Sequence, residues 1–556
     1  MNWFFLSSVI NIWFDSSSTV ARTVTIVLLL FAFLQNSAAK KRQHSIVASN
    51  AAVATNHGQC SKIGINVLHQ GGNAIDAYVA VALCLGVVNP GSSGLGGGSF
   101  AVVKMASGKE TAYDFREVAP LRATEDMYGG NLELKKKGPL SVAVPGEVAG
   151  LFTAWKQLGK LPWKQLVYPA EKLAAEGYMI SKYLYMQMNA TRDDILADKG
   201  GLSELFASNG ELKKPGTIVR NPKLAFTLKQ IAEHGPKVFY NGTVGVNLVN
   251  DIQKLGGIVT LKDLHNYKVK VKKPLSNDIL GYRLLGMPPP SSGGSSMVLI
   301  LNILSQYGIP KGVAGPLGVH RLVEALKHAF AVRMNLGDPD FVDVIKVIVS
   351  DMLSPKFAQE LKKKINDDKT FDPKYYGGKW NEIHDHGTSH FSIIDKERNV
   401  VAMTTTINDV PPPAPANFIR PGKRSLSSMS PTIVLKDGKV KAAVGASGGL
   451  YHSRATQVFL NHFFPQHGYS LFRHGSKNLP PAETKLYEDW RTVYNDHFEL
   501  PKETRDVLEN KGHVLTPIAD GAISQLIVVE SGGNSNGTNR LVAVSDPRKG
   551  GFHSGY

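Results

Sequence analysis

Two short segments near residue 400 constrain the fold of this chain more than any other part of it. Residues 388–395 and 399–408 alternate side chains with a period of two, are rich in β-branched residues, and flank the polar run 396–399. This pattern predicts a β-hairpin. With its turn at the polar run, Thr388 lies opposite Thr406 or one step away, at about 4.5–5.5 Å between Cβ atoms. The hairpin therefore brings two hydroxyl groups within hydrogen-bonding reach.

A glycine precedes the first of these threonines. Gly387 leaves its carbonyl unshielded, and it can adopt the strained backbone that attack by the Thr388 hydroxyl on that carbonyl requires. Thr388 is then either a nucleophile made by self-cleavage or an ordinary strand residue, since the β-branched shape of threonine suits sheets. The hairpin alone leaves both interpretations open.

Length and composition indicate a globular protein. The 556 residues suffice for several domains or one large layered domain, and 43% hydrophobic with 20% charged residues is an ordinary balance. The net charge of +17 raises the question of nucleic acid, but the lysine runs at 135–137, 270–273 and 362–364 are scattered and lack interleaved aromatic residues. We expect no nucleic acid partner, and at most a loose attraction to an acidic cell wall or anionic lipid.

The N-terminus carries a targeting signal. The apolar run 24–34 is too short to span a bilayer, follows Arg22, and is followed by the small residues 37–39. Residues 1–43 are therefore expected to be a signal peptide or, because residues 3–14 are also apolar, an uncleaved signal anchor. Either segment directs the chain into the secretory pathway.

Only two cysteines occur, Cys60 and Cys84. Two helical patterns, at 63–68 and 75–83, lie between them around a Gly71-Gly72 stop. Two short helices that fold back would bring the thiols together, so a disulfide is expected, with two buried free thiols as the alternative. No metal site is expected, because two cysteines are too few and the 17 histidines form no HxxxH or similar cluster that we would defend as a metal site.

Three Asn-x-Thr triplets, at Asn189, Asn241 and Asn536, are acceptors for N-glycosylation. Such triplets also occur by chance, so this expectation depends on the N-terminal signal.

Three further segments carry groups suited to a site. The glycine-rich run 91–98 lacks the features of a phosphate loop and predicts close backbone packing beside a site. Arg116 would clamp a substrate carboxylate or simply pair with Asp114 or Glu117. The pair Gly448-Gly449 follows a strand and would either offer N–H groups to an oxyanion or form a turn.

Together these segments resemble the γ-glutamyltransferase (γ-glutamyl transpeptidase) family, and its plant secretory members most closely. The resemblance covers about residues 45–449 and 490–551. Its motifs occur in one order: Asp-x-Arg-Glu-x-Ala-Pro at 114–120, His-Gly-Thr-Ser-His-Phe-Ser at 386–392, Thr-x-Asn at 406–408, Pro-Gly-Lys-Arg-Ser-Leu-Ser-Ser-Met at 421–429, and Gly-Gly at 448–449.

The resemblance implies an α/β (α+β) fold, the four-layer αββα sandwich of N-terminal-nucleophile hydrolases. Self-cleavage between Gly387 and Thr388 would divide the precursor into a large subunit, residues 44–387, and a small subunit, residues 388–556, which stay together as a heterodimer. No cofactor and no metal are implied. The freed α-amine of Thr388 would titrate at about 7.7–8 and serve as general base.

The family pattern assigns a role to each matching residue. The nucleophile is Thr388, oriented by Thr406, with Gly448 and Gly449 as the oxyanion hole. Arg116, Ser427 and Ser428 hold the substrate α-carboxylate, and Asn408 helps hold the α-amine. The implied reaction moves the γ-glutamyl group of glutathione or its conjugates to an amino acid, a dipeptide or water.

Two segments depart from the family pattern. The segment Asn-Asn-Glu-Met-Asp-Asp-Phe, which follows Thr-x-Asn in the family and binds the substrate amine, is absent after Asn408. The helix expected after the glycine pair is replaced by a stretch rich in His and Pro at 450–488. These departures keep two alternatives open: a non-catalytic homologue that binds without turnover, and a related amidohydrolase such as the cephalosporin acylases. The expected location is the apoplast or cell surface, with the vacuole as second choice.

Overall fold

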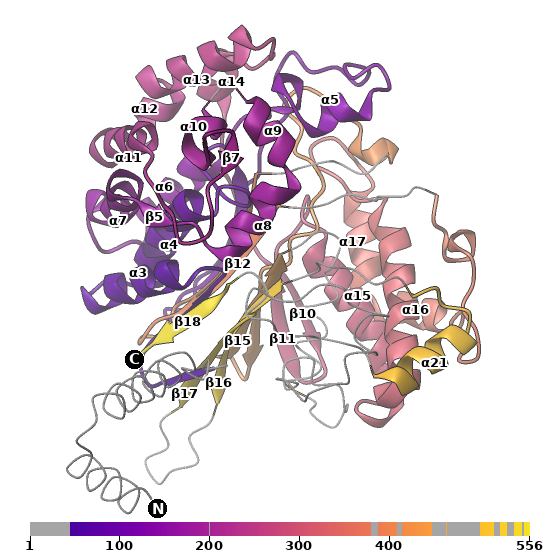
Figure 1. Cartoon of the computed structure of the whole chain (residues 1–556). Coiled ribbons are helices and arrows are strands. Elements are labelled where there is room, and N and C mark those ends of the chain that lie inside the picture. Colours follow the sequence, from indigo (N-terminus) through magenta and orange to yellow (C-terminus); the bar gives the residue numbers. More distant parts are fainter. Residues whose placement is uncertain are drawn as a thin grey trace, which may run out of the picture. The chain divides into compact units, whose positions relative to one another are not determined.

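Two antiparallel sheets of seven strands each form the centre of the fold (Figure 1). The computed structural model describes residues 45–198, 201–379, 387–407, 414–447, 463, 501–515, 523–530, 539–546 and 550–556. Sheet A has the strand order β1-β17-β16-β15-β14-β11-β10, and sheet B has the order β18-β2-β12-β13-β3-β4-β9. The residues from Ser45 to Tyr556 form one compact unit, and the expected signal segment 1–43 lies outside the described residues.

The strands of sheet A are β1 (Ile46–Ala48), β17 (Arg540–Ser545), β16 (Ile523–Glu530), β15 (Lys439–Ser447), β14 (Thr432–Lys436), β11 (Tyr282–Gly286) and β10 (Leu275–Ile279). Those of sheet B are β18 (Phe552–Gly555), β2 (Ala52–Thr55), β12 (Thr388–Ile394), β13 (Val400–Thr406), β3 (Gly98–Lys104), β4 (Glu110–Phe115) and β9 (Lys270–Lys272). Two small sheets pair β5 (Tyr178–Met179) with β8 (Ile218–Val219), and β6 (Ala207–Ser208) with β7 (Glu211–Leu212).

Helices cover the outer face of each sheet (Figure 1). Sheet B is covered by α3 (Gly58–His69), α4 (Ala74–Val88) and α6 (Glu147–Leu158), while α7 (Trp163–Glu176) packs on α4 and α11 (Pro222–His234) packs on α7. Sheet A is covered by α15 (Gly293–Ser305), on which α16 (Gly315–Arg333), α17 (Ile345–Leu353) and α18 (Pro355–Lys362) pack, and α21 (Lys502–Asn510) packs on α16. The shorter helices are α5 (Leu132–Lys136), α8 (Lys182–Ala190), α9 (Arg192–Ala197), α10 (Leu202–Phe206), α12 (Lys237–Tyr240), α13 (Thr243–Lys254) and α14 (Leu261–Asn266).

Between the sheets lies a separate apolar core. Alternate strand residues point to opposite faces, and small or branched side chains such as Ala54, Val102, Ile433 and Ala443 fill the space where the inner faces meet. The fold is therefore the four-layer αββα sandwich that the sequence predicted.

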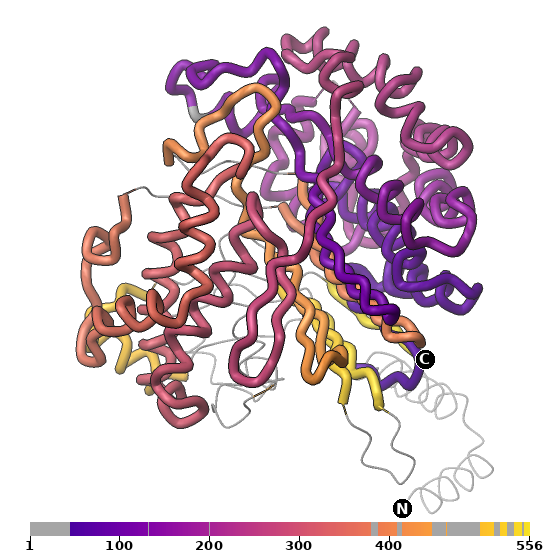
Figure 2. The backbone as a smooth tube through the Cα atoms, turned by 180° about the vertical axis from the view of Figure 1, so that it is seen from behind, coloured from indigo at the N-terminus to yellow at the C-terminus, as the bar shows by residue number. Residues whose placement is uncertain are grey.

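The strands from either side of Thr388 are interleaved. In sheet B, β12 and β13 lie between β2 and β3, and in sheet A, β14 to β17 lie between β11 and β1. The chain also passes from one sheet to the other between β9 and β10, which Figure 2 shows from behind. Residues 44–387 and 388–556 thus build the same two sheets and are not separate globular domains.

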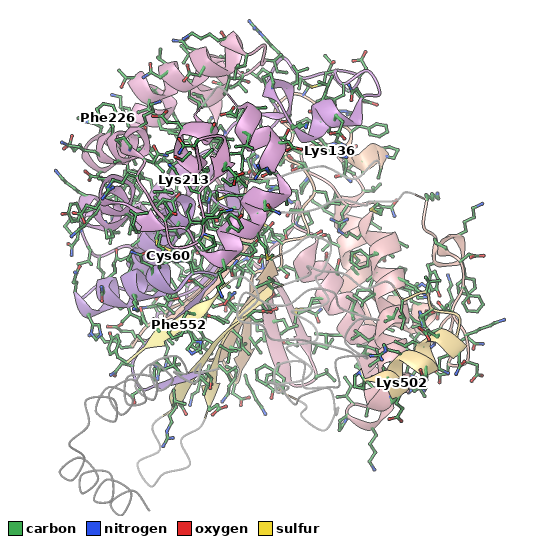
Figure 3. The ribbon with its side chains drawn as sticks, viewed as in Figure 1. Cys60, Lys136, Lys213, Phe226, Lys502 and Phe552 are labelled. Carbon is green, nitrogen blue, oxygen red and sulfur yellow. A yellow bond between two sulfur atoms is a disulfide. The ribbon has the colours of Figure 1, made fainter. Side chains whose placement is uncertain are left out.

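The first helix pair forms as the sequence predicted. Asn73 caps α4 by accepting hydrogen bonds from the backbone of Ile75 and Asp76, while Asp76 accepts one from the backbone of Asn73. The expected disulfide between Cys60 of α3 and Cys84 of α4 is present, with 5.6 Å between Cα atoms. Cys60 is labelled among the helices that cover sheet B in Figure 3. Within the described part of the chain, no helix has the length and apolar character needed to cross a membrane.

Candidate active site

The ends of four adjacent strands of sheet B meet in one row. Thr388 of β12 pairs with Thr406 of β13, and Thr406 pairs with Gly98 of β3. Phe115, the last residue of β4, pairs with Ser99 of β3. Arg116 is the next residue in the chain and so lies level with Gly98, the residue before Ser99. The predicted alignment of the two threonines is confirmed, and Arg116 lies three strand spacings from Thr388, about 14 Å between Cα atoms.

The two threonines enclose the peptide bond that is expected to break. The Thr388 hydroxyl donates to Thr406 Oγ1 at 3.3 Å, and the Thr406 hydroxyl donates to the carbonyl oxygen of Gly387 at 2.7 Å. Both side chains are buried, with 6% and 1% of their surface exposed. Gly387 has φ +86°, a left-handed conformation that favours glycine. The carbonyl before the nucleophile is thus already hydrogen-bonded by the opposite strand.

The glycine-rich segment packs its backbone against this row. A Cβ on Gly97 would overlap the carbonyl oxygen of Thr406, and one on Gly98 would lie 2.5 Å from the carbonyl oxygen of Phe115. Side chains at these positions would push β13 and β4 away from β3. The close packing predicted for residues 91–98 is therefore confirmed at Gly97 and Gly98.

Arg116 has a carboxylate partner within the chain. It is buried, and its Nη1 lies 3.2 Å from Glu117 Oε2. Burial raises the pKa of Glu117, while the charge of Arg116 lowers it. Asp114 binds other cations, Lys272 at 2.6 Å and Arg424 at 3.2 Å. Of the pairings expected from the sequence, the one with Glu117 is therefore present.

Ser427 and Ser428 lie on the side of sheet A and are held by a residue that the sequence analysis missed. Arg333, the fully buried last residue of α16, donates from Nη2 to Ser428 Oγ at 2.7 Å and from Nε to Ser292 Oγ at 2.9 Å. The Ser292 hydroxyl in turn donates to the carbonyl oxygen of Ser427 at 2.8 Å. Basic side chains near the C-terminus of a helix commonly interact with its last carbonyl groups. The position of Arg333 in the sequence therefore did not indicate its hydrogen bonds to Ser428 and Ser292.

Several predicted site residues lie outside the described part of the chain: Asn408, Gly448 and Gly449, together with Asn536 and the stretch 450–488 except residue 463. Strand β15 ends at Ser447, directly before the glycine pair, and Ser447 pairs with Ile523. The other two glycosylation acceptors, Asn189 and Asn241, are exposed.

A cavity of about 480 Å³ lies beside this row of strand ends. Its lining includes Ile407, the residue after Thr406, and Glu117, the residue after Arg116. Its walls combine apolar side chains, such as Met127 and Phe418, with both acidic and basic ones. Among the charged residues that line it are Glu125, Lys135, Lys423 and Arg424.

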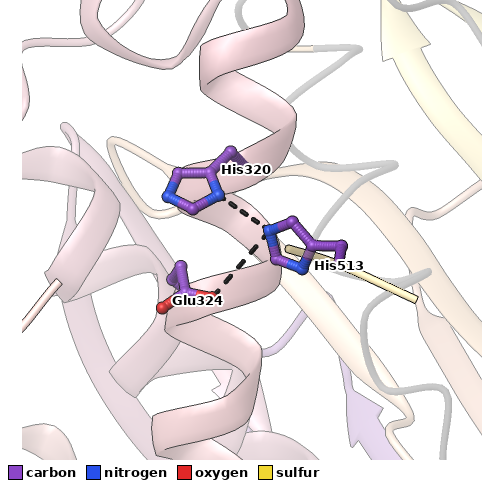
Figure 4. Close-up of side chains that lie close together, drawn as sticks. All are labelled: His320, Glu324 and His513. Carbon is purple, nitrogen blue, oxygen red and sulfur yellow. Dashed lines mark hydrogen bonds and ion pairs between the residues drawn. The ribbon is translucent and has the colours of Figure 1, made fainter. Parts of the chain in front are cut away.

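One group of side chains has the composition of a metal site (Figure 4). His320 Nδ1 lies 2.8 Å from His513 Nε2, which lies 4.0 Å from Glu324 Oε1. Two His and one Glu can hold zinc, but Oε1 of Glu324 also accepts from Lys327 Nζ at 3.1 Å and from the Thr370 hydroxyl at 2.7 Å. The lysine already balances the carboxylate charge, so we read this group as a buried polar link between α16 and the segment after α21.

The sandwich, with a buried threonine at the start of a central strand, defines an N-terminal-nucleophile hydrolase. The family model for gamma-glutamyltranspeptidase matches residues 60–410 and 408–556. This chain belongs to that family.

Comparison with individual relatives supports the same family assignment. The chain is 69% identical to glutathione hydrolase 2 of Arabidopsis thaliana over 580 positions, covering 98% of this chain and 100% of the relative. It is 34% identical to the glutathione hydrolase proenzyme of Escherichia coli, covering 91% of each.

Solved structures show the same architecture. A cephalosporin acylase from Bacillus halodurans superposes with a TM-score of 0.75 at 24% identity, over 93% of this chain and 98% of that one, which shows the fold. The gamma-glutamyltranspeptidase of Helicobacter pylori has a TM-score of 0.54 at 36% identity, over 57% of this chain and 92% of that one.

The comparisons also bear on the missing segment. The two matches to the family model meet at residues 408–410, where the sequence departs from the family pattern. The alignment with the Arabidopsis relative extends over 580 positions, more than the 556 residues of this chain, so the relative has residues without a counterpart here.

Proposed function

We propose that this protein is a self-processing γ-glutamyltransferase and glutathione hydrolase with Thr388 as nucleophile. One observation carries the proposal: the Thr406 hydroxyl bridges the Thr388 hydroxyl and the Gly387 carbonyl. The relatives named glutathione hydrolase indicate the substrate.

Self-cleavage would use this bridge directly. Thr388 Oγ1 attacks the Gly387 carbonyl carbon, and Thr406 donates to the oxygen as negative charge develops on it. The C–N bond breaks, the nitrogen takes up the proton lost from the hydroxyl, and an ester links Gly387 to Thr388. Water hydrolyses this ester, which leaves a carboxylate on Gly387 and a free α-amine on Thr388.

The processed enzyme would repeat this chemistry on its substrate. The α-amine of Thr388 takes the proton of its own hydroxyl, which attacks the γ-carbonyl and expels the amine of the leaving group. The N–H groups of Gly448 and Gly449, after β15, stabilise the oxyanion. The γ-glutamyl ester on Thr388 is then transferred to the amine of an amino acid or dipeptide, or to water.

The substrate glutamate would extend along the row. Arg116, three strands from Thr388, with Ser427 and Ser428, binds the α-carboxylate, and Asn408 binds the α-amine. Arg333 supports this assignment because it fixes the Ser428 hydroxyl. The cavity beside Ile407, with Glu125 and Lys135 in its walls, offers both charges that a zwitterionic acceptor requires.

A second candidate is an amidohydrolase of another acyl substrate. The likeness to cephalosporin acylase concerns the fold alone, at 24% identity. Arg116 and the serine pair instead suit a substrate with a free α-carboxylate, which favours γ-glutamyl transfer.

A denaturing gel of the purified protein tests the nucleophile. We expect two fragments, the smaller beginning at Thr388, and release of the aniline from a γ-glutamyl anilide. Thr388→Ala should remain one chain and release nothing. A wild-type protein that stays uncut would contradict the enzyme assignment and favour the non-catalytic alternative.

We also propose that the protein enters the secretory pathway, with the apoplast or cell surface as its location and the vacuole as the alternative. The disulfide and the exposed Asn189 and Asn241 support this. A fluorescent fusion at the C-terminus, followed by salt extraction of the cell wall and by treatment with a glycosidase, distinguishes a soluble, wall-bound or membrane-anchored form.

A further inference from the structure

Glu147, at the start of α6, lies directly behind the row of active-site residues. Its carboxyl group accepts a hydrogen bond from the Ser99 hydroxyl and one from the Thr405 hydroxyl, the latter at 3.4 Å. These two residues pair with each other across β3 and β13. They immediately neighbour Gly98 and Thr406, the residues that form the active-site row in the same two strands.

Backbone groups at the start of α6 also form hydrogen bonds at the beginning of β3. The N–H groups of Gly146 and Glu147 both donate to the carbonyl oxygen of Gly97, at 2.9 and 3.0 Å. Gly97 in turn packs against the carbonyl of Thr406. The first turn of α6 therefore holds β3 through its backbone, and it links β3 to β13 through one side chain.

Residues one step apart on a strand point to opposite faces. Thr405 and Ser99 thus turn toward the helices, while Thr406 turns toward the nucleophile. A small shift of β13 against β3 would move the Thr406 hydroxyl away from both Gly387 and Thr388.

We propose that Glu147 is a positioning residue: by joining Ser99 to Thr405 it fixes how β13 lies against β3, and so where Thr406 lies relative to Thr388. It does not contact substrate. This inference rests on the function proposed above, because Thr406 is the group that it positions.

The surroundings of Glu147 favour its uncharged form. Burial is the main cause that raises its pKa to about 8, and the charge of Glu117 adds to this, while the hydrogen bonds from Ser99 and Thr405 oppose it. The titratable groups that face it are Tyr78 of α4, Tyr240 of α12 and Glu117, which is paired with Arg116. The ionised carboxylate still accepts both hydrogen bonds, but above this pH it places a second buried negative charge beside Glu117, and the repulsion between the two carboxylates shifts Glu147 and the strands that it joins.

The pH dependence separates this role from that of the nucleophile. The α-amine of Thr388 must lose a proton to act as base, so kcat/KM rises through about 7.7–8. Glu147 must keep its proton, so kcat/KM falls above pH 8. The wild-type profile should therefore be bell-shaped.

Glu147→Gln is the informative variant, because glutamine keeps the shape and hydrogen bonds but does not ionise. We expect self-cleavage and kcat within about threefold of wild type at pH 7.5, with the falling limb absent up to pH 10. Glu147→Leu should lower kcat about 10- to 100-fold and leave KM within about threefold, since one buried hydrogen-bonding link is lost. Glu176→Gln, at an exposed site on α7, serves as the matched control and should keep the wild-type profile.

A Glu147→Gln profile with an unchanged falling limb, or a folded Glu147→Leu variant with wild-type kcat, would overturn the positioning role. Wild-type protein that neither cleaves itself nor releases the aniline from a γ-glutamyl anilide would instead overturn the proposed function. Circular dichroism and the melting temperature of each variant show whether it is folded, and the Gln variant decides the question if the Leu variant is not.

Discussion

Removing the Thr406 hydroxyl tests the proposed self-cleavage most directly. Valine has nearly the shape of threonine, so Thr406→Val keeps the β-branched packing of β13 while it removes one donor and one acceptor. The variant loses the hydrogen bond to the Gly387 carbonyl at 2.7 Å and the longer one from Thr388 at 3.3 Å. We expect the precursor to fold and to cleave itself slowly.

The size of the effect follows from what each bond does during the attack. A donor aimed at a developing oxyanion is worth about 2.7–4 kcal/mol in the barrier. The 3.3 Å bond is long for two hydroxyl groups, so its loss adds at most about 1 kcal/mol. Since each ~1.4 kcal/mol is tenfold in rate, self-cleavage should slow by about 100- to 4,000-fold.

The assay is a time course of the purified precursor on a denaturing gel, with the new N-terminus identified by mass spectrometry. Thr406→Ser is the matched control: it keeps the hydroxyl and should cleave within about tenfold of wild type. If Thr406→Val cleaves as fast as wild type while Thr406→Ser does the same, the hydroxyl bridge has no part in the reaction. The melting temperatures of both variants must match that of uncut Thr388→Ala for the comparison to hold.

Four further predictions concern the backbone and the core. Gly387→Ala forces a side chain into a left-handed conformation at φ +86°, so precursor cleavage on a gel should slow measurably, by about 1–2 kcal/mol in the barrier. Gly445→Ala would set a Cβ 2.6 Å from His390 Nδ1, and the urea midpoint should fall, by about 1–3 kcal/mol of stability. Burial lowers the pKa of His390 to about 3 from 6.5, so between these pH values the unfolded protein binds a proton that the folded protein does not. The free energy of unfolding should therefore fall by about 2 kcal/mol from pH 7 to pH 5. The fall should be smaller in His390→Gln. Replacing Cys60 and Cys84 with serine opens a loop with a separation of 24 residues and should cost about 3 kcal/mol, seen as a lower melting temperature.

The central hairpin could be predicted from the sequence because its information is local. Period-two alternation fixes which side chains share a face, and the polar turn fixes the register, so Thr388 had to fall near Thr406. The close backbone packing of the glycine-rich segment could also be predicted, because two backbones approach closely only where residues lack a Cβ.

The supporting residues could not be predicted in this way, because their partners lie far along the chain. Glu147 and Thr405 are 258 residues apart, and Arg333 and Ser428 are 95 apart. A glutamate in the first turn of a helix and an arginine in its last are what the helix dipole favours anyway. The helix dipole alone accounts for the positions of Glu147 and Arg333 in the sequence. Their contacts with distant residues therefore become visible only in the folded structure.

The interleaved topology explains how such a chain can be cut at its own active site and remain one enzyme. Cleavage before β12 removes one covalent bond, but β12 keeps its ladders with β2 and β13, and β13 keeps its ladder with β3. The segment after α21 also stays linked to α16 through His513 and His320. In the proposed self-cleavage, the new N-terminus of Thr388 would appear at a sheet end whose register is already fixed by strands of the large segment. The bridge from Thr406 that would support the cut would then face the substrate, so one arrangement of β12, β13 and β3 would serve both the single self-cleavage and every later turnover.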